Sequence, residues 1–173
     1  ARDCFKGHVT SSHTHAVDFV KELSRKDHWF YDLDSLASSF YHPVSDGPGA
    51  TREQMLKKLE TPREMYRKIA GMYGKPFYFG EIGCCAVAGA TKLPYFWANG
   101  GGYDGEEQAR YLDVVCETFW DEPWWTGLYW WKWEEQNYRP QFHDDPAGDK
   151  GFTVWSKPAA GVMTSWFARK DRA

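Results

Sequence analysis

Apolar positions along this chain change their period several times, and the changes predict a repeated order of strand and then helix. Short runs bounded by glycine, proline or polar residues predict strands at 7–12, 35–41, 76–80 and 126–133. After the first run, apolar residues recur with the i, i+3, i+4, i+7 spacing of an amphipathic helix near 16–25. The residues of this stripe are Ala16, Phe19, Val20 and Leu23.

Capping signals place the longest helix. One capping-box pattern begins at Thr51 and another at Thr61, where Pro62 suits the first helical position. The helix that these signals introduce is expected to run to about Tyr73, with Gly74 just past its end.

Two further helices complete the order, and together the elements suggest a fold class. Asp104 opens a third helix, and Ser156 with Pro158 starts a closing one. Four strand–helix units in a row are typical of a parallel sheet with helices packed outside it. An open doubly wound sheet and part of a barrel both fit this order. No Gly-x-Gly-x-x-Gly turn follows the first strand, so dinucleotide binding has no support.

Glu81 stands at the carboxyl end of the third expected strand, before a turn at Gly83. Folds built from parallel strands and helices place their chemistry at this rim of the sheet. Because side chains alternate along a strand, Glu81 is expected on the same face as Phe77 and Phe79. The alternative is that Glu81 only caps the following turn or pairs with a lysine.

Composition narrows the function classes. The chain has 173 residues, enough for one domain with an ordinary core, and its net charge of −3 gives no basic footprint for nucleic acid. The sequence contains no run of eighteen apolar residues, so no membrane span is expected. No signal peptide is visible and the chain opens on Ala1, which suggests a trimmed, processed or engineered start and leaves the localisation unknown.

Aromatic residues and cysteines add two expectations. The chain has 10 Trp, 10 Tyr and 11 Phe, and Trp and Tyr suit stacking on sugar rings, although most of these side chains are expected in the core. The cysteines match no zinc or redox spacing, and an adjacent pair would strain to form a disulfide. We expect free, mostly buried thiols at Cys4, Cys84, Cys85 and Cys116.

Several motifs together resemble the carboxyl-terminal half of glycoside hydrolase family 113, whose members are β-mannanase-like retaining glycosidases of clan A. The resemblance extends from about Gly7 to Phe167. It is moderately specific through the order and spacing of the Glu81 strand and the Gly127–Trp133 stretch. The motifs are Phe79-Gly-Glu-Ile-Gly83, Glu106-Glu-Gln-Ala-Arg110, Trp120-Asp-Glu-Pro-Trp124, Gly127-Leu-Tyr-Trp-Trp-Lys-Trp133, Lys157-Pro158 and the stretch 33–44.

The resemblance implies a (β/α)4 half of a TIM barrel, formed by residues 1–173 as a single domain. It makes the four strands the fifth to eighth of a barrel that usually takes about 250 residues. In clan A the acid/base glutamate ends the fourth strand, and no residue here matches it. Glu81 matches the nucleophile at the end of the seventh strand.

Other site residues follow from the same resemblance. Tyr41 matches the tyrosine that donates to the nucleophile, although a core tyrosine at a strand end fits the sequence equally well. His42 is expected beside Tyr41, at the rim of the opening in which the substrate would bind. Trp131 and Trp133 are expected on the inner face of the last strand, where a tryptophan floors the sugar site. Trp97, on the long loop after Glu81, serves either as an outer sugar platform or as a loop anchor.

Weaker candidates do not change this assignment. His13 and His15 follow the first strand and are interpreted as solvated loop histidines, with substrate contact as the alternative. The His143-Asp-Asp145 stretch together with Asp149 could hold a cation, but an acidic surface loop is commoner. We therefore assign no metal site and no cofactor.

The function predicted is retaining hydrolysis of a β-1,4-linked polysaccharide such as mannan or cellulose. This reaction needs two carboxyl groups roughly 5–5.5 Å apart. The alternative is a non-catalytic carbohydrate-binding or vestigial half, and a doubly wound binding module ranks third. The partner expected is the missing amino-terminal half-barrel or a second copy, because four strands leave open edges and an open face. In a second copy, Glu134 or Glu135 could supply the second carboxyl group.

Overall fold

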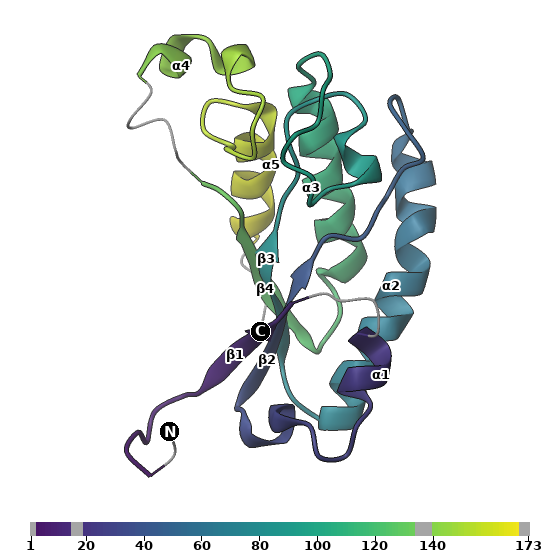
Figure 1. Cartoon of the computed structure of the whole chain (residues 1–173), viewed down its shortest axis with the longest axis vertical. Helices are drawn as coiled ribbons and strands as arrows, with labels where there is room; N and C mark the ends of the chain where they lie inside the picture. Colours follow the sequence, from purple (N-terminus) through teal and green to yellow (C-terminus); the bar gives the residue numbers. More distant parts are fainter. Residues whose placement is uncertain (1–2, 15–18, 134–139, 170–173) are drawn as a thin grey trace.

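A computed structural model describes residues 3–14, 19–133 and 140–169 (Figure 1). The strands are β1 (Thr10–His13), β2 (Ser35–Phe40), β3 (Phe77–Ile82) and β4 (Trp125–Trp130). The α-helices are α1 (Phe19–Leu23), α2 (Arg52–Tyr73), α3 (Gly105–Phe119), α4 (Gln141–Asp144) and α5 (Pro158–Phe167). Short 3₁₀ turns are η1 (Trp29–Asp32), η2 (Ala90–Lys92) and η4 (Pro146–Gly148).

The four strands form one parallel sheet in the order β1-β2-β3-β4. Each strand lies beside the next along the chain, so the order never reverses as a doubly wound sheet requires. Helix α2 packs against α3, and α3 packs against α5, which places a helical layer over one face of the sheet (Figure 1). The expected (β/α)4 half of a TIM barrel is confirmed, and the doubly wound alternative is wrong.

The predicted capping of α2 is confirmed at both ends. Thr51 accepts a hydrogen bond from the Gln54 amide while the Gln54 side chain accepts one from the Thr51 amide. Gly74 ends the helix in the left-handed conformation, with φ of 62°. Pro62, however, lies buried inside one continuous helix instead of starting a second one. Burial of its ring offsets part of the cost of the backbone hydrogen bond that proline cannot donate.

Helices α3 and α5 begin where the sequence predicts. Asp104 caps α3 by accepting a hydrogen bond from the Glu107 amide, and Pro158 is the first residue of α5. The other half of the capping box at Asp104 is not made, because the Glu107 carboxylate binds the loop after β3. Helix α1 is shorter than the expected 16–25, and residues 15–18 lie outside the described part of the chain.

The core lies between the sheet and the helices. Phe77 and Phe79 are fully buried, and Tyr66 of α2 lies 5.2 Å from each ring by centroid distance. Phe119 of α3 lies 4.9 Å from Phe79. The expectation that Glu81 lies on the same face of the strand as Phe77 and Phe79 is therefore wrong. The largest apolar residues of a strand face the layer that can bury them, and in this chain that layer is helical.

The opposite face of the sheet is open. Tyr78 and Tyr129 point to this side, with their rings 5.7 Å apart, and Tyr129 is 68% exposed. The Thr10 hydroxyl lies 3.1 Å from that of Tyr78. Within the described residues, β1 and β4 each pair with only one neighbour. In a closed barrel this face and both edges would be covered.

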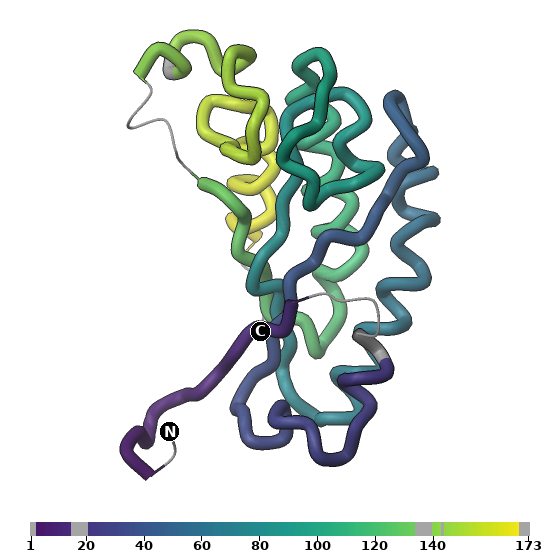
Figure 2. The backbone as a smooth tube through the Cα atoms, in the orientation of Figure 1, coloured from purple at the N-terminus to yellow at the C-terminus, as the bar shows by residue number. Residues whose placement is uncertain are grey.

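The loops after β3 and β4 gather at the carboxyl end of the sheet (Figure 2). The Ala86 amide donates to the carbonyls of Lys150 and Gly151, which joins the two loops. All four cysteines are free, with Cys4 exposed and the others buried, as expected. No described helix has the length and hydropathy needed to cross a bilayer.

Candidate active site

Glu81 and Tyr41 meet at the carboxyl end of the sheet. Glu81 is the penultimate residue of β3, and Tyr41 directly follows β2, its neighbour. The Tyr41 hydroxyl donates a hydrogen bond of 2.5 Å to Oε1 of Glu81. Burial, and then the bond to Glu81, raise the pKa of Tyr41 far above its usual value. Tyr41 therefore stays a neutral donor at any ordinary pH, which suits the stabilisation of an ionised carboxylate.

A bulge in β3 directs Glu81 away from the helices. Ser38 of β2 pairs with Phe79, but Ser39 pairs with Glu81, so Gly80 is an extra residue on β3. Beyond this bulge, Ile82 continues the buried face in place of Glu81. Bulges of this kind redirect a side chain next to a functional site.

Glycine is the only residue type that position 80 accommodates without a shift of its neighbours. A Cβ atom at Gly80 would lie 2.7 Å from the Ser12 hydroxyl oxygen and 3.4 Å from the Ala37 methyl group. The first distance is far below van der Waals contact. The bulge at Gly80 thus lies against two small residues of the inner face, Ser12 and Ala37. The bulge and these small neighbours together determine where Glu81 lies.

Two adjoining cavities flank Glu81. The larger has a volume of about 680 Å³, and the smaller, of about 480 Å³, shares Tyr41, Glu81 and Tyr95 with it. Aromatic rings with exposed surface line the larger one, including Trp97 (79% exposed) and Trp131 (46% exposed). Such rings offer flat apolar faces in the same cavity as the Glu81 carboxylate, an arrangement that suits a sugar chain.

The structure brings together most of the residues that the sequence suggested. Tyr41, Glu81, Trp97 and Trp131 line the larger cavity, and His42 lines the smaller one. Trp133 is 47% exposed and lines neither cavity. Glu134 and Glu135 lie outside the described residues.

His13 is not the loop histidine that we expected. Its side chain is only 11% exposed and lies 3.3 Å from the Glu22 carboxylate. It also stacks on Trp29, and it lines neither cavity beside Glu81. His15 lies outside the described residues.

Sequence reasoning missed the wall that the loop before α5 supplies. Asp149, Lys150, Gly151 and Phe152 line the larger cavity. Behind them Lys157 is fully buried, lies 3.6 Å from the Asp149 carboxylate and donates to the Gly151 carbonyl. Burial lowers the pKa of Lys157. From the sequence, Asp149 is only a possible cation ligand and Lys157 is only part of the Lys157-Pro158 pair, and neither pattern indicates an ion pair between the two.

Two buried side chains at the start of α3 hold both loops in place. The Glu107 carboxylate accepts hydrogen bonds from the Gly89 amide at 2.9 Å and the Thr91 hydroxyl at 2.7 Å. The Gln108 amide donates to the carbonyls of Cys84 at 2.9 Å and Phe152 at 3.3 Å. These contacts fix the cleft walls to a rigid helix.

The cleft offers one available carboxylate. Among the described residues that line the two cavities, the carboxylates are Glu81 and Asp149. Asp149 is already committed, because Lys157 and the Gly151 amide bind it. A reaction that needs two working carboxyl groups must therefore take its second one from outside this set.

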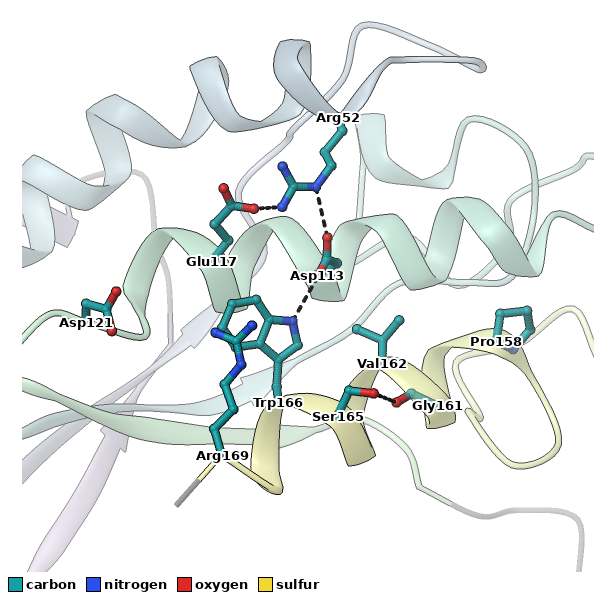
Figure 3. Close-up of a pocket in the computed structure, with 10 residues that line it drawn as sticks. All are labelled: Arg52, Asp113, Glu117, Asp121, Pro158, Gly161, Val162, Ser165, Trp166 and Arg169. Atoms are coloured by element: carbon teal, nitrogen blue, oxygen red, sulfur yellow. Dashed lines mark hydrogen bonds and ion pairs between the residues drawn. The ribbon is translucent and has the colours of Figure 1, made fainter. Parts of the chain in front are cut away.

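A separate cavity of about 710 Å³ lies on the helical surface between α3 and α5 (Figure 3). Three of its charged groups pair with one another: Arg52 pairs with Asp113 and Glu117, and the Trp166 indole also donates to Asp113 at 2.8 Å. Because these groups are paired and lie on the outer helical layer, we do not assign the active site there.

Comparison with known proteins decides the family. The model of Glycoside Hydrolase Family 113 matches residues 1–157. The chain belongs to this family. A search of the curated proteins finds no match.

Solved structures agree on the fold of this family 113 chain. It is similar to the GH113 β-mannanase of Alicyclobacillus acidocaldarius, with a TM-score of 0.74 and 24% identity over 96% of this chain and 47% of that one. It is also similar to a GH113 β-1,4-mannanase, with a TM-score of 0.69 and 27% identity over 97% of this chain and 48% of that one. A Bifidobacterium dentium β-glucuronidase shares the fold at 14% identity, over 93% of this chain and 24% of that one, with a TM-score of 0.55. The chain spans about half the length of the mannanases that it matches.

Proposed function

We propose that this chain is the nucleophile-bearing half of a retaining glycoside hydrolase that cleaves a β-1,4-linked polysaccharide, with Glu81 as the nucleophile. The observation that carries this proposal is the 2.5 Å hydrogen bond from Tyr41 to Glu81 at the junction of two aromatic-lined cavities. Membership of family 113 supports a glycosidase. Residues 1–173 then form a single half-barrel domain.

In this mechanism the Glu81 carboxylate attacks the anomeric carbon while a second carboxyl group protonates the leaving oxygen. Tyr41 holds the Glu81 carboxylate in its orientation by donating a hydrogen bond to Oε1. Water then hydrolyses the glycosyl ester, and the second carboxyl group acts as the base in that step.

In this proposal the second carboxyl group comes from outside residues 1–173 of the chain that supplies Glu81. We favour an amino-terminal half-barrel, because the chain covers only 47–48% of the related mannanases. A second copy of the chain is the other arrangement, in which Glu134 or Glu135 serves. Sedimentation at micromolar concentration checks this step, since either partner should bury the open face around Tyr129. A well-folded monomer that carries full activity would contradict both arrangements.

A mechanism-based inactivator tests the nucleophile without the missing acid. A 2-deoxy-2-fluoro β-mannoside with a dinitrophenolate leaving group needs no protonation to depart, so Glu81 alone should form the glycosyl ester. We expect mass spectrometry to find one added sugar on the peptide that carries Glu81.

Two variants make the trapping experiment specific. Glu81→Gln should abolish labelling, and Tyr41→Phe should slow it without moving the label. Labelling of another residue in the unmodified chain would refute the assignment of Glu81.

The substrate proposed first is mannan, because the solved relatives are named as β-mannanases; cellulose is the other candidate. Trp97 and Trp131 are the stacking surfaces expected to hold the polymer. Turnover of soluble mannan and of a soluble cellulose derivative by the complete assembly would rank the two.

The exposed aromatic wall also favours a second candidate, a carbohydrate-binding half without catalysis. The exposed ring of Trp97 can bind sugar whether or not an acid is present. Retardation by mannan in affinity electrophoresis that Glu81→Gln leaves unchanged, together with absent labelling by the inactivator, would favour this candidate over the hydrolase.

A further inference from the structure

A second group of reactive side chains lies beside β1. It consists of His13 at the end of β1, Glu22 in α1 and His28 just before η1. Each offers a nitrogen or carboxylate oxygen, and these atoms lie within 4.8 Å of one another. In the described part of the chain, no other three His, Cys, Asp or Glu side chains come together in this way. None of the three lines the cavities beside Glu81.

His28 is the buried member of this group, at 5% exposure. Its Nδ1 accepts a hydrogen bond of 3.2 Å from the Phe30 amide, whereas its Nε2 is buried without a hydrogen-bond partner. Buried polar atoms normally have a partner, so this nitrogen requires an explanation. A cation between the imidazole rings and the carboxylate would supply the partner.

The other two members are already close to each other. Nε2 of His13 lies 3.3 Å from Oε2 of Glu22, whose side chain is 44% exposed. Trp29 stacks on both histidines, with ring centroids 6.4 Å from His13 and 5.0 Å from His28. The group therefore has an apolar wall on one side and access to water through Glu22, which is the setting of many metal sites.

We propose that His13, Glu22 and His28 bind a divalent transition-metal ion of the zinc class, with water as the fourth ligand. Two imidazoles, one carboxylate and a water form a tetrahedral set that Zn²⁺ takes in proteins. Magnesium and calcium, in contrast, prefer oxygen ligands throughout. The ion joins the open edge strand β1 to α1 and to the turn before β2, so its role is to stabilise this edge.

Coordination by His28 changes one hydrogen bond. Because Nδ1 accepts the Phe30 amide hydrogen, the neutral ring carries its proton on Nε2. When Nε2 binds the metal, the ring carries its proton on Nδ1 instead. Nδ1 can then no longer accept the 3.2 Å hydrogen bond from the Phe30 amide, so the metal bond replaces this hydrogen bond. The Phe30 amide should then report metal binding by a change in its NMR shift.

Zinc titration of the whole chain tests the proposal. Because the exposed thiol of Cys4 also binds zinc, the parent protein for the titration is Cys4→Ser. We expect one Zn²⁺ per chain by equilibrium dialysis. At free zinc 100 times its Kd, the Tm should rise by about 5–10 °C.

Matched variants separate this site from adventitious binding. His28→Asn keeps an oxygen for the Phe30 amide but removes Nε2, and Glu22→Gln changes a half-exposed ligand without disturbing the core. Each should weaken zinc binding at least about tenfold, whereas His8→Gln, at an exposed histidine bonded to Ser35, should not. Absence of saturable binding by the parent would overturn the proposal, and so would a zinc affinity in His28→Asn and Glu22→Gln equal to that of the parent.

Discussion

On the helix-covered side of the sheet, Phe79 lies fully buried among Tyr66 and Phe119; on the other side, one strand away, Tyr129 is 68% exposed. The first face completes its packing within this chain, while the second carries polar and aromatic groups with little above them. The difference indicates that the burial that stabilises this chain lies on one face, whereas the proposed chemistry lies at the rim of the other. A half-barrel can therefore complete its packing on the helical side and still leave the other face open to a partner.

The largest expected effect tests the closed face. Phe79→Ala removes a ring that packs on α2 and α3, so it should lower the free energy of unfolding by about 3–5 kcal/mol. Tyr129→Ala on the open face should change it by about 0.5 kcal/mol or less. Urea unfolding followed by far-ultraviolet circular dichroism measures both. Equal losses would show that the two faces do not differ as described.

Glu107 gives the next largest effect, at the junction between the helical layer and the cleft. Glu107→Gln places an amide donor among the donors of Gly89 and Thr91, so it should cost about 1–3 kcal/mol. Hydrogen exchange at the Gly89 amide should become faster, because the carboxylate that it binds is gone. Glu106→Gln, at an exposed position of the same helix turn, is the control and should leave exchange unchanged.

The sequence predicted the helix ends better than the strand faces. The caps at Thr51 and Gly74 are local signals, since each satisfies backbone groups within one turn. Which side chains of β3 point to which face depends on the bulge at Gly80. This bulge is defined by the pairing with β2, because two consecutive residues of β2 lie opposite Phe79 and Glu81. Pairing between strands cannot be read from either strand alone.

The candidate site shows the same difference between local signals and contacts that depend on packing. The position of Glu81 at the sheet rim could be predicted because a strand-end carboxylate is a local pattern, whereas its contact with Tyr41 was suggested only by the family resemblance. The contact of Lys157 with Asp149 was missed, because those residues are placed by loop packing and not by period or spacing. Trp133 was expected beside Trp131, yet it lies outside both cavities. Strict alternation does not extend past the end of β4 at Trp130.

A pH dependence adds a smaller test of the closed side. Burial alone would raise the pKa of Glu122, but hydrogen bonds from Arg67, Arg63 and Trp124 outweigh it and hold the pKa below its ordinary value. Because the folded-state pKa is lowered, the stability from Glu122 is fully present above about pH 4.3, the ordinary value. It is lost as the pH falls through the folded-state pKa.

The measurement is the midpoint of urea unfolding between about pH 6 and pH 3. Glu122→Gln should flatten the fall in stability below about pH 4.3, because glutamine does not titrate. Removal of both guanidinium partners, in Arg63→Gln with Arg67→Gln, should flatten it as well. A curve in either variant as steep as that of the parent would refute the role given to this group.

The smallest expected effect lies on the open face. Tyr78→Phe removes the hydroxyl that lies 3.1 Å from the Thr10 hydroxyl, and water can replace this exposed contact. The free energy of unfolding of the chain alone should therefore change by no more than about 0.5 kcal/mol. With a partner half seated on this face, the same hydroxyl would be buried, and its loss should cost more. A loss above about 1 kcal/mol in the chain alone, at a concentration where sedimentation shows only monomer, would mean that this face is already closed without a partner.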